Sequence, residues 1–297
     1  MQDILIFGKS GQVGRSLLEL FQSNIDLHAF DSKDADFTNE YQIRELIQKI
    51  KPKVIINAAA YTAVDKAESD EALAFKVNAE AVKIIGEEAT NIGASVIHFS
   101  SDYVFDGTKK GTYVEADRAR PSSVYGSSKL KGEDLLLKTC KHSIILRTSW
   151  VVSHYGENFL KTIIKLAKKR DVLHVVTDQH GVPTSANLLA EVSKILTEKL
   201  LSDPEKFPYG VYHLTPTGDT TWFDYAKFVI REAIKRGEKF KLDLDSIYPI
   251  EAQNYPLPAR RPKNSLLNTS HIRNTFDLTL PSWQEGILDI MDQLYKR

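Results

Sequence analysis

Cysteine is almost absent from this sequence. Cys140 is the only cysteine in 297 residues, so the chain has neither an internal disulfide nor a cysteine-rich metal site. A chain without disulfides is typical of a reducing compartment, and we therefore expect a cytoplasmic protein.

Net charge and long hydrophobic runs are also lacking. Lysine plus arginine and aspartate plus glutamate both number 39, which leaves a formal net charge of zero. No overall field favours nucleic acid or an anionic membrane, so an anionic ligand must be bound by local groups. Residues 1–7 run into a strand-like segment with no basic start and no long apolar run. We expect neither a signal peptide nor a membrane span.

The first half of the chain alternates short apolar runs with helical patterns. The apolar runs, which we interpret as strands, are residues 4–7, 25–30, 54–57, 96–99 and 144–147. The helical patterns between them are residues 12–22, 40–49, 68–91 and 122–138. Strands of this length separated by helices indicate βαβ units. We predict an α/β fold with a doubly wound parallel sheet of the Rossmann type, covered by helices on both faces.

The second half is less regular. Its helical patterns are residues 159–169 and 188–200, two further helices that begin near residues 220 and 282, and a short strand at 211–214. We expect some of these segments to return to the sheet and the rest to cap it. This predicts a dinucleotide-binding domain over residues 1–154, to which 184–215 return, and a smaller, discontinuous substrate-binding domain in the remainder of 155–297.

Three glycines follow the first predicted strand and open the first predicted helix. Gly8, Gly11 and Gly14 have the spacing G-x-x-G-x-x-G. Such a turn lets backbone N–H groups contact a pyrophosphate at a helix N-terminus, where the helix dipole favours negative charge. An ordinary strand-to-helix turn is the alternative, but the position at the start of a βαβ pattern favours dinucleotide binding.

The residues after the second strand bear on which dinucleotide is bound. Asp31 ends that strand, where a carboxylate can accept hydrogen bonds from the ribose hydroxyls of NADH. Lys9 and Lys33 lie nearby in the sequence and can offset the 2′-phosphate of NADPH. Asp31 can equally be a plain turn residue. Both NADH and NADPH therefore stay open.

Tyr125 and Lys129 are the candidate catalytic pair. They form a Y-x-x-x-K motif on a predicted helix, and a separation of four residues places both side chains on one face. A free tyrosine has a pKa of about 10, and a nearby ammonium is expected to lower it towards the working range. The alternative is an amphipathic surface pair.

Small and hydroxyl-bearing residues follow the third and fourth predicted strands. Asn57–Ala60 offer small side chains against which a cofactor can lie, or simply a tightly packed core. Ser100 and Ser101 follow the strand at 96–99. Ligands bind beyond the carboxyl ends of parallel strands, and a serine hydroxyl there can hydrogen-bond a substrate carbonyl.

With the glycine turn, these residues resemble the extended short-chain dehydrogenase/reductases. Longer motifs are similar to those of the dTDP-4-dehydrorhamnose reductase family. They are the glycine turn Gly8–Gly14, NAAAYTAVDKAE (Asn57–Glu68), SSDYVF (Ser100–Phe105), RTSWV (Arg147–Val151), DQHGVPT (Asp178–Thr184) and PARRP (Pro258–Pro262), and they span nearly the whole chain. The resemblance implies a nucleotide-sugar substrate and NADPH- or NADH-dependent reduction of the C4 keto group of dTDP-4-dehydro-L-rhamnose to give dTDP-L-rhamnose, a precursor of cell-surface polysaccharide.

The resemblance also implies roles for individual residues. Tyr125 donates the proton, Lys129 tunes Tyr125, and Ser101, where the family often has threonine, keeps the hydroxyl. Asp102 and Trp150 match positions on the substrate side. Positions on the cofactor side are matched by Gly8, Gly11, Gln12, Val13, Gly14, Asp31, Asp36, Phe37, Ala60, Tyr61 and Thr62, together with Tyr125 and Lys129.

One tryptophan and two arginines each have two possible roles. Trp150 follows the fifth strand, where an indole can pack on a sugar ring or lie in the core between domains. Arg260 and Arg261 can bind the diphosphate, because guanidinium groups suit phosphate oxygens, or they can form a structural salt bridge.

One departure from the family concerns metal. Some members dimerise through acidic residues that hold Mg²⁺, and the matching positions here are Ser16, Asn187 and Gln293. Since Mg²⁺ prefers carboxylate oxygens, we predict no metal. The oligomeric state, monomer or homodimer, stays open.

Two other functions remain as alternatives. The first is reduction of another nucleotide-linked 4-keto sugar. The second is a catalytically silent, NADP-binding regulatory subunit, such as that of methionine adenosyltransferase, which resembles the same family. The presence of Ser101, Tyr125 and Lys129 together favours an enzyme.

Overall fold

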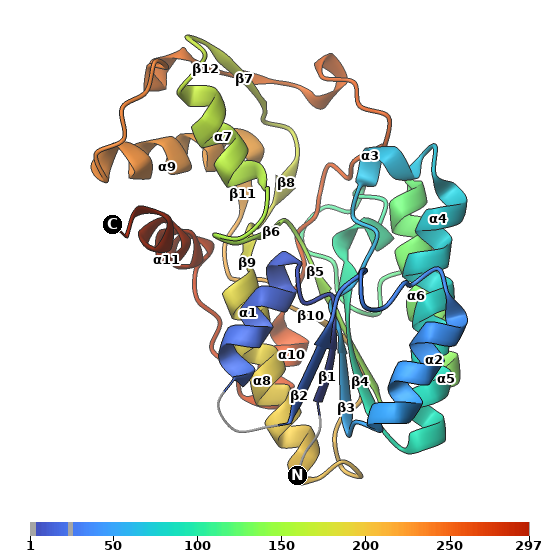
Figure 1. Cartoon of the computed structure of the whole chain (residues 1–297). Coiled ribbons are helices and arrows are strands. Elements are labelled where there is room, and N and C mark those ends of the chain that lie inside the picture. Colours follow the sequence, from blue (N-terminus) through green and yellow to red (C-terminus); the bar gives the residue numbers. More distant parts are fainter. Residues whose placement is uncertain (1–3, 23–25, 297) are drawn as a thin grey trace.

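A six-stranded parallel sheet forms the centre of the computed structural model, which describes residues 4–22 and 26–296 (Figure 1). The strand order is β10-β5-β4-β3-β1-β2, and every pair is parallel. The strands are β1 (Ile4–Phe7), β2 (Leu27–Phe30), β3 (Val54–Asn57), β4 (Ser95–Ser101), β5 (Ser143–Thr148) and β10 (Gly210–His213). This confirms the predicted doubly wound α/β fold.

The central strands are apolar on both faces because both faces are covered. Ile4 and Ile6 of β1 belong to one buried cluster, whereas Leu5 and Phe7 belong to another on the opposite face. Alternate residues of a strand point to opposite sides of a sheet. A strand that is buried on both faces therefore reads as a continuous apolar run, which is why the sequence revealed these strands.

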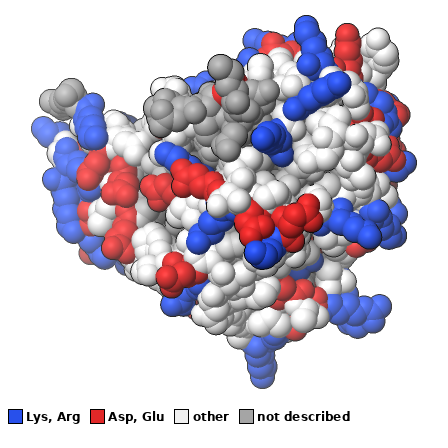
Figure 2. Space-filling view, turned by 90° about the horizontal axis from the view of Figure 1, so that it is seen from below, with Lys and Arg blue, Asp and Glu red and all other residues white. Residues whose placement is uncertain are grey.

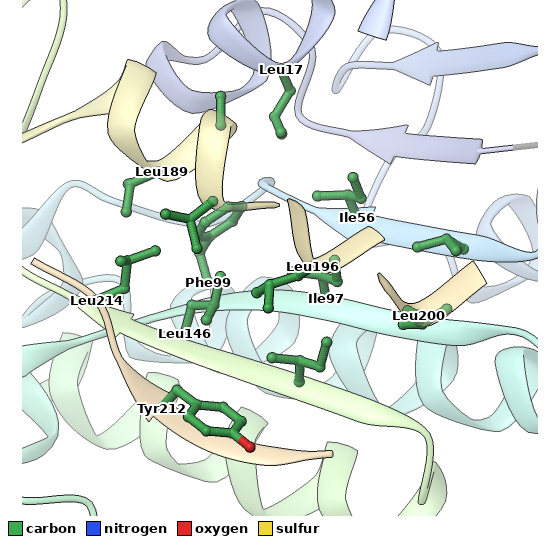
Figure 3. Close-up of a cluster of buried hydrophobic side chains, with 14 of the residues drawn as sticks. Leu17, Ile56, Ile97, Phe99, Leu146, Leu189, Leu196, Leu200, Tyr212 and Leu214 are labelled. Atoms are coloured by element: carbon green, nitrogen blue, oxygen red, sulfur yellow. The ribbon is translucent and has the colours of Figure 1, made fainter. Parts of the chain in front are cut away.

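Helices cover the two faces in two layers (Figure 1). One layer consists of α1 (Gln12–Phe21), α8 (Ala186–Ser202) and α10 (Ser270–Phe276). Figure 3 shows its core, in which Leu17 of α1 and Leu189 of α8 lie over Ile56 and Ile97 of the sheet. The other layer consists of α2 (Glu40–Ile50), α5 (Ala81–Ile92) and α6 (Val124–Thr139).

The helix predicted over residues 68–91 starts later in the structure and contains a π-helical turn. The segment after β3 forms α3 (Val64–Ala67), α4 (Glu71–Phe75), a π-helix η1 (Lys76–Glu80) and α5. Residues 71–92 are helical without a break, so the predicted helix is confirmed with a start three residues later. Its π-helical turn was not foreseen, because apolar periodicity does not register the extra residue that such a turn takes up. Single-turn π-helices occur frequently near functional sites, and η1 packs against α6.

The remaining segments lie above the sheet in Figure 1 and form what we call the upper lobe, residues 151–185 and 216–265 together with α11. Its helices are α7 (Phe159–Ala167), α9 (Trp222–Lys235) and α11 (Trp283–Tyr295). Its short strands are β6 (Val151–Val152), β7 (Leu173–Val176), β8 (His180–Gly181), β9 (Thr184–Ser185), β11 (Thr220–Thr221) and β12 (Ile247–Ile250). Its 3-10 turns are η3 (Leu244–Ser246) and η4 (Ala252–Asn254). A further 3-10 turn, η2 (Asp102–Val104), lies outside this lobe and follows β4.

The chain crosses between the sheet and the upper lobe more than once. After β5 it enters the upper lobe, then returns through α8, which packs on α1, and β10, which pairs with β5. It then re-enters the upper lobe with α9 and comes back to the sheet once more with α10. The sheet therefore depends on segments from both halves of the sequence.

Neither charge dominates the face of the molecule seen in Figure 2. On the face seen in Figure 2, basic and acidic side chains are interspersed, in line with equal numbers of the two over the sequence. Among the described residues, no helix combines the length and the apolar character that crossing a bilayer requires.

Candidate active site

The carboxyl ends of the parallel strands meet at one edge of the sheet, and the sequence-predicted residues gather there. Gly8 follows β1, Asp31 follows β2, Ala58 follows β3 and Ser101 ends β4. Trp150 comes two residues after β5. Parallel sheets bind ligands outside this edge, where the strand order reverses.

The glycine turn brings β1, β3 and α1 unusually close together. Gly8 has a φ of +88°, and a β-carbon on it would lie 2.6 Å from the Ala58 carbonyl carbon. A β-carbon on Gly14 would lie 2.0 Å from the Gly8 oxygen. Gly11 is the N-cap of α1 and supplies no capping side chain. The N-terminus of α1 thus presents backbone N–H groups without a side-chain acceptor, which suits a pyrophosphate.

Gln12 and Val13 use their side chains within the protein. The Gln12 Oε1 atom accepts hydrogen bonds from the Ser153 backbone N–H and from Asn158 Nδ2, both at 2.9 Å. Val13 packs against the buried cluster beside α8. The sequence predicted that both residues contact the cofactor. Because their side chains are engaged within the protein, only their backbone groups remain available for such a contact.

The acidic and basic residues near β2 bond to one another. Asp31 Oδ1 accepts from the Lys33 backbone N–H at 2.9 Å. The Lys9 ammonium pairs with Asp34 at 2.5 Å, and the hydrogen bond that it donates to the Asp34 carboxylate raises the pKa of Lys9. Lys9 is therefore already neutralised in part, while the exposed Lys33 has no ion pair among the described residues. This arrangement favours neither NADH nor NADPH decisively.

The other residues predicted on the cofactor side divide between core and surface. Phe37 is buried and meets Phe7 edge-on, with ring centroids 5.2 Å apart. The carboxylate of Asp36 accepts the Thr38 N–H, which lowers its pKa. The Tyr61 backbone N–H donates to Asn78 Oδ1 at 2.8 Å. Ala60 and Thr62 flank Tyr61 in the loop after β3, and Thr62 is exposed.

Helix α6 carries the Tyr125 and Lys129 side chains and is fixed by close glycine contacts. A β-carbon on Gly126 would lie 2.2 Å from the Tyr103 oxygen, and one on Gly132 would lie 2.0 Å from the Asn78 oxygen. The side chain of Ser123 caps the helix by accepting from the Gly126 N–H at 3.1 Å. The helix thus lies against both η2 and η1, and the register of its catalytic face is fixed.

Tyr125 is half-buried beside a second tyrosine. Its ring meets Tyr103 edge-on, with centroids 5.4 Å apart. Burial raises the pKa of Tyr125 to about 12, a hydrogen bond with Ser101 lowers it, and the charge of Asp102 raises it. The expectation that Lys129 lowers this pKa was wrong for the structure as it stands, because the ammonium faces elsewhere.

Lys129 is directed into the sheet. Its Nζ atom donates to the Phe99 carbonyl oxygen at 2.6 Å and lies 3.3 Å from His98 Nε2. The side chain is 2% exposed, and burial lowers its pKa to about 8. Sequence reasoning missed His98, since a histidine inside an apolar strand carries no signal of a role.

Ser101 and Asp102 lie beside Tyr125 at the end of β4. The Ser101 hydroxyl accepts the Tyr103 N–H at 3.1 Å and donates to Asp102 Oδ1 at 3.0 Å. Burial raises the pKa of Asp102 to about 6, while the nearby Ser265 and Ser101 side chains lower it. The second oxygen, Oδ2, is buried without a hydrogen-bond partner. A buried acceptor without a partner fits a ligand hydroxyl.

Trp150 joins the sheet to the upper lobe. It has a φ of +45°, and its ring stacks on Trp222 of α9 with centroids 3.6 Å apart and an interplanar angle of 16°. The backbone of Gly181 approaches the same indole so closely that a β-carbon would lie 2.6 Å from it. Of the two open alternatives, the structure shows the interlobe contact.

A cavity of about 1120 Å³ extends from Trp222 through the upper lobe. Aromatic and basic side chains line part of it, among them Phe159, Trp222, Tyr255, Arg260, Arg261 and Lys263. Trp222 both lines this cavity and stacks on Trp150. The cavity therefore begins next to the Trp150 position that the sequence assigned to the substrate.

The two arginines of the PARRP motif differ. Arg261 forms a paired contact with Asp65, Nη1 to Oδ1 at 2.9 Å and Nη2 to Oδ2 at 2.7 Å. Arg260 is exposed, lines the cavity and forms no ion pair among the described residues. Arg261 thus takes the salt-bridge alternative, and Arg260 remains free to bind an anion. Sequence reasoning missed Asp65.

The positions matched to a metal site carry neutral groups. The Ser16 hydroxyl donates to Asn187 Oδ1 at 2.8 Å, which joins α1 to α8. Gln293 lies on α11. Throughout the part of the chain that the structure describes, no three His, Cys, Asp or Glu residues come together as metal ligands would. The absence of metal binding stays a prediction.

Known proteins match this chain over nearly its whole length. The family model described as RmlD substrate binding domain matches residues 1–296. The dTDP-4-dehydrorhamnose reductase of Escherichia coli strain K12 is 44% identical over 297 residues, which cover 99% of this chain and 98% of that protein. The spore coat polysaccharide biosynthesis protein SpsK of Bacillus subtilis strain 168 is 32% identical over 294 residues, covering 99% and 98%.

Solved structures agree. A crystal structure of dTDP-4-dehydrorhamnose reductase from Bacillus anthracis strain Ames, in complex with NADP, superimposes with a TM-score of 0.89 at 35% identity and covers 99% of this chain and 100% of that one. The corresponding Clostridium acetobutylicum structure also has a TM-score of 0.89, at 36% identity and 99% coverage of both chains. Sequence, fold and site geometry together place the chain in the RmlD substrate binding domain family, that of the dTDP-4-dehydrorhamnose reductases.

Proposed function

We propose that this protein reduces the C4 keto group of dTDP-4-dehydro-L-rhamnose to give dTDP-L-rhamnose, with NADPH or NADH as reductant. The observation that carries the proposal is the convergence of Ser101 and Tyr125 at the carboxyl edge of the sheet, beyond the glycine turn. Membership of the family supports the choice of substrate.

Tyr125 is the proposed proton donor. Its raised pKa keeps the phenol protonated at neutral pH, so it can give a proton to an oxygen that gains negative charge. The nicotinamide, when bound, supplies the hydride. The Ser101 hydroxyl lies beside the phenol and can donate a hydrogen bond to the same oxygen.

The cofactor cradle fits a dinucleotide. Gly8, Gly11 and Gly14 leave the N-terminus of α1 accessible to a pyrophosphate. Asp31 lies where the adenosine ribose is bound in sheets of this type. Lys129, one helical turn after Tyr125, is proposed to contact the ribose next to the nicotinamide.

The substrate is proposed to extend from the sheet edge into the upper lobe. The unpaired Asp102 oxygen suits a sugar hydroxyl. The cavity beyond Trp222 has aromatic walls for a base, and the guanidinium of Arg260 suits a diphosphate. Trp150 forms the boundary between the two regions.

This arrangement supports the assignment of the two ligands to different parts of the chain. We propose that residues 1–154, with 184–215 returning to them, bind the dinucleotide, and that the rest of 155–297 binds the nucleotide sugar. We further propose a cytoplasmic location, in keeping with the single cysteine, and no metal or nucleic-acid partner.

The test is a turnover assay on the purified chain with enzymatically generated dTDP-4-dehydrorhamnose and each reduced dinucleotide. Oxidation of the dinucleotide together with dTDP-L-rhamnose as product is expected. A higher rate with another nucleotide-linked 4-keto sugar would reassign the substrate. Dinucleotide binding without oxidation in the presence of any keto sugar would contradict an enzymatic role and favour a regulatory one.

A further inference from the structure

The helix that begins at the glycine turn is attached to one segment of the upper lobe. Residues 151–158, which we call the bridging segment, run from β6 to the N-cap of α7. Gln12, the first residue of α1, forms four hydrogen bonds with this segment. The proposed reduction uses the backbone of Gln12 at the cofactor and gives no role to its side chain.

The Gln12 side-chain amide has a single orientation that satisfies its neighbours. Its Oε1 atom accepts from the Ser153 backbone N–H and from Asn158 Nδ2, both at 2.9 Å. Its Nε2 group donates to the Val151 carbonyl oxygen at 3.4 Å. A rotated amide would place its NH₂ group against two donors. The amide therefore joins the beginning of the bridging segment to its end.

The far end of the bridging segment leads into the wall of the cavity. Asn158 caps α7 through its Oδ1 atom, which accepts from the backbone of the first turn at 3.1 Å, while its Nδ2 group donates to Gln12. Phe159, Thr162 and Ile163 of that helix line the cavity of the upper lobe. One asparagine thus lies between the Gln12 amide and the helix that forms the cavity wall.

The backbone of Gln12 belongs to the proposed cofactor cradle. Because Gln12 is the first residue of α1, its N–H group has no acceptor inside the helix. A pyrophosphate bound at this helix N-terminus would restrain the backbone of Gln12. The same restraint then acts on the amide, and through the amide on Ser153 and Asn158.

We infer that Gln12 is a positioning residue that couples the two proposed ligand sites. A dinucleotide bound at α1 orders the bridging segment and the first turn of α7 through the Gln12 amide. The inference rests on the proposed function, because it relates the two ligands named there. A nucleoside diphosphate that meets an ordered cavity wall loses less conformational entropy on binding. Each ligand therefore raises the affinity for the other by the same factor.

A second set of contacts attaches the bridging segment to α1 further along the helix. The Tyr155 hydroxyl donates to the Glu19 carboxylate, and the Arg15 guanidinium lies 5.0 Å from the centroid of the Tyr155 ring. The Arg15 backbone N–H is already bonded to the Gly11 carbonyl oxygen, so these contacts lie beyond the free N–H donors at the helix start. Tyr155→Phe is therefore a matched variant, which weakens the attachment and leaves Gln12 in place.

The test is hydrogen–deuterium exchange of the full chain, read by mass spectrometry with and without a saturating reduced dinucleotide, NADPH or NADH. In the wild type, exchange over residues 153–163 should slow about fivefold or more when the dinucleotide binds. Gln12→Met keeps the side-chain stem near Gly156 and removes the amide, so the slowing should be lost although the dinucleotide still binds. Equal slowing in both proteins, or none in the wild type, would overturn the inference.

Two variants serve as controls. Tyr155→Phe should exchange faster than the wild type in the free protein, yet keep the slowing on dinucleotide binding. Gln48→Met removes an amide that joins α2 to α5 by a bond to Glu88, and it should respond as the wild type does. A loss of slowing in either control as complete as in Gln12→Met would show that any loosening removes it, and it would overturn the specific role of Gln12.

A binding measurement checks the reciprocal effect. By calorimetry, dTDP should bind the wild type about fivefold or more tightly with the dinucleotide present than without it, and this difference should fall below about twofold in Gln12→Met. Independent binding of the two ligands in the wild type would overturn the inference. None of these measurements needs turnover. A failed turnover assay would therefore reject the proposed reduction alone, whereas turnover without the slowed exchange would reject the coupling alone.

Discussion

Gly132 of α6 lies so close to Asn78 of η1 that a β-carbon on it would be only 2.0 Å from the Asn78 carbonyl oxygen. The same asparagine donates from Nδ2 to the Ser128 hydroxyl of α6 at 3.0 Å and holds the Tyr61 backbone. One π-helical residue thus fixes the distance between α6 and the loop after β3. The catalytic face of α6 owes its position to this contact.

The first prediction concerns that contact. Gly132→Ala should destabilise the fold by ~3 kcal/mol or more, because the obstructing atom is backbone and the clash outweighs a gain in helix propensity of about 1 kcal/mol. Urea unfolding measures the change. Gly286→Ala in α11 is the control, since its β-carbon would meet only the Ser185 side chain at 3.2 Å, and it should change stability by less than about 1 kcal/mol. Equal effects in the two variants would contradict the account.

The second prediction concerns the phenol. Tyr125→Phe should reduce turnover by a factor on the order of 10³ or more, because the ring packing on Tyr103 survives while the proton donor is lost. Dinucleotide affinity, measured by fluorescence titration, should stay within about twofold, a free-energy change below RT. Tyr41→Phe, at a side chain that is 71% exposed on α2, is the control. Near-normal turnover in Tyr125→Phe would remove this residue as the acid.

The third prediction follows from the pKa of Asp102, which is raised in the folded protein to about 6. The folded state holds a proton more tightly than the unfolded state, whose aspartate titrates near 3.9. Stability from this group is therefore present below about pH 4, falls as pH rises to about 6 and stays low above it.

Asp102→Asn removes that pH dependence. The free energy of unfolding of the variant, relative to that of the wild type, should rise by roughly 1 kcal/mol between pH 5 and pH 7.5. Asp106→Asn is the control, because hydrogen bonds from Thr108 lower the pKa of Asp106. The contribution of Asp106 therefore changes only below about pH 4, and the effect of this substitution should be constant from pH 5 to pH 7.5. A pH-independent effect of Asp102→Asn would contradict the raised pKa.

The fourth prediction separates the two arginines. Arg260→Ala should raise the KM for the nucleotide sugar about tenfold, a loss of about 1.4 kcal/mol in binding, and leave thermal stability unchanged. Arg261→Ala should lower stability instead, and a double-mutant cycle with Asp65→Ala should give a coupling of about 0.5–1 kcal/mol, because the pair is only partly buried. The reverse pattern would move the diphosphate contact to Arg261.

Much of the fold could be predicted because its signals are local. Strands buried on both faces give uninterrupted apolar runs, as at Ile4–Phe7 and Val54–Asn57, and a glycine turn between strand and helix stands out in the sequence. The Tyr125 and Lys129 spacing is also local, since a separation of four residues fixes a shared helix face. These features need no knowledge of distant partners.

The parts that sequence reasoning missed depend on distant partners. Arg261 and Asp65 are 196 residues apart, and no pattern links them. Trp150 meets Trp222 only because the chain has left the sheet and come back. The direction in which the pKa of Tyr125 shifts depends on where the Lys129 ammonium points. His98 and Phe99, 31 and 30 residues away from Lys129, set the orientation of that ammonium.

The late arrival of β10 has a consequence for how the molecule is made. Strand β10 completes the sheet beside β5, yet its residues 210–213 are synthesised long after β1–β4. Until then a nascent chain presents β5 as an unpaired edge with Ile144, Ile145 and Leu146, and exposed apolar edges recruit other chains. A fragment that stops at residue 154 should therefore aggregate during translation rather than survive as a free-standing nucleotide-binding module.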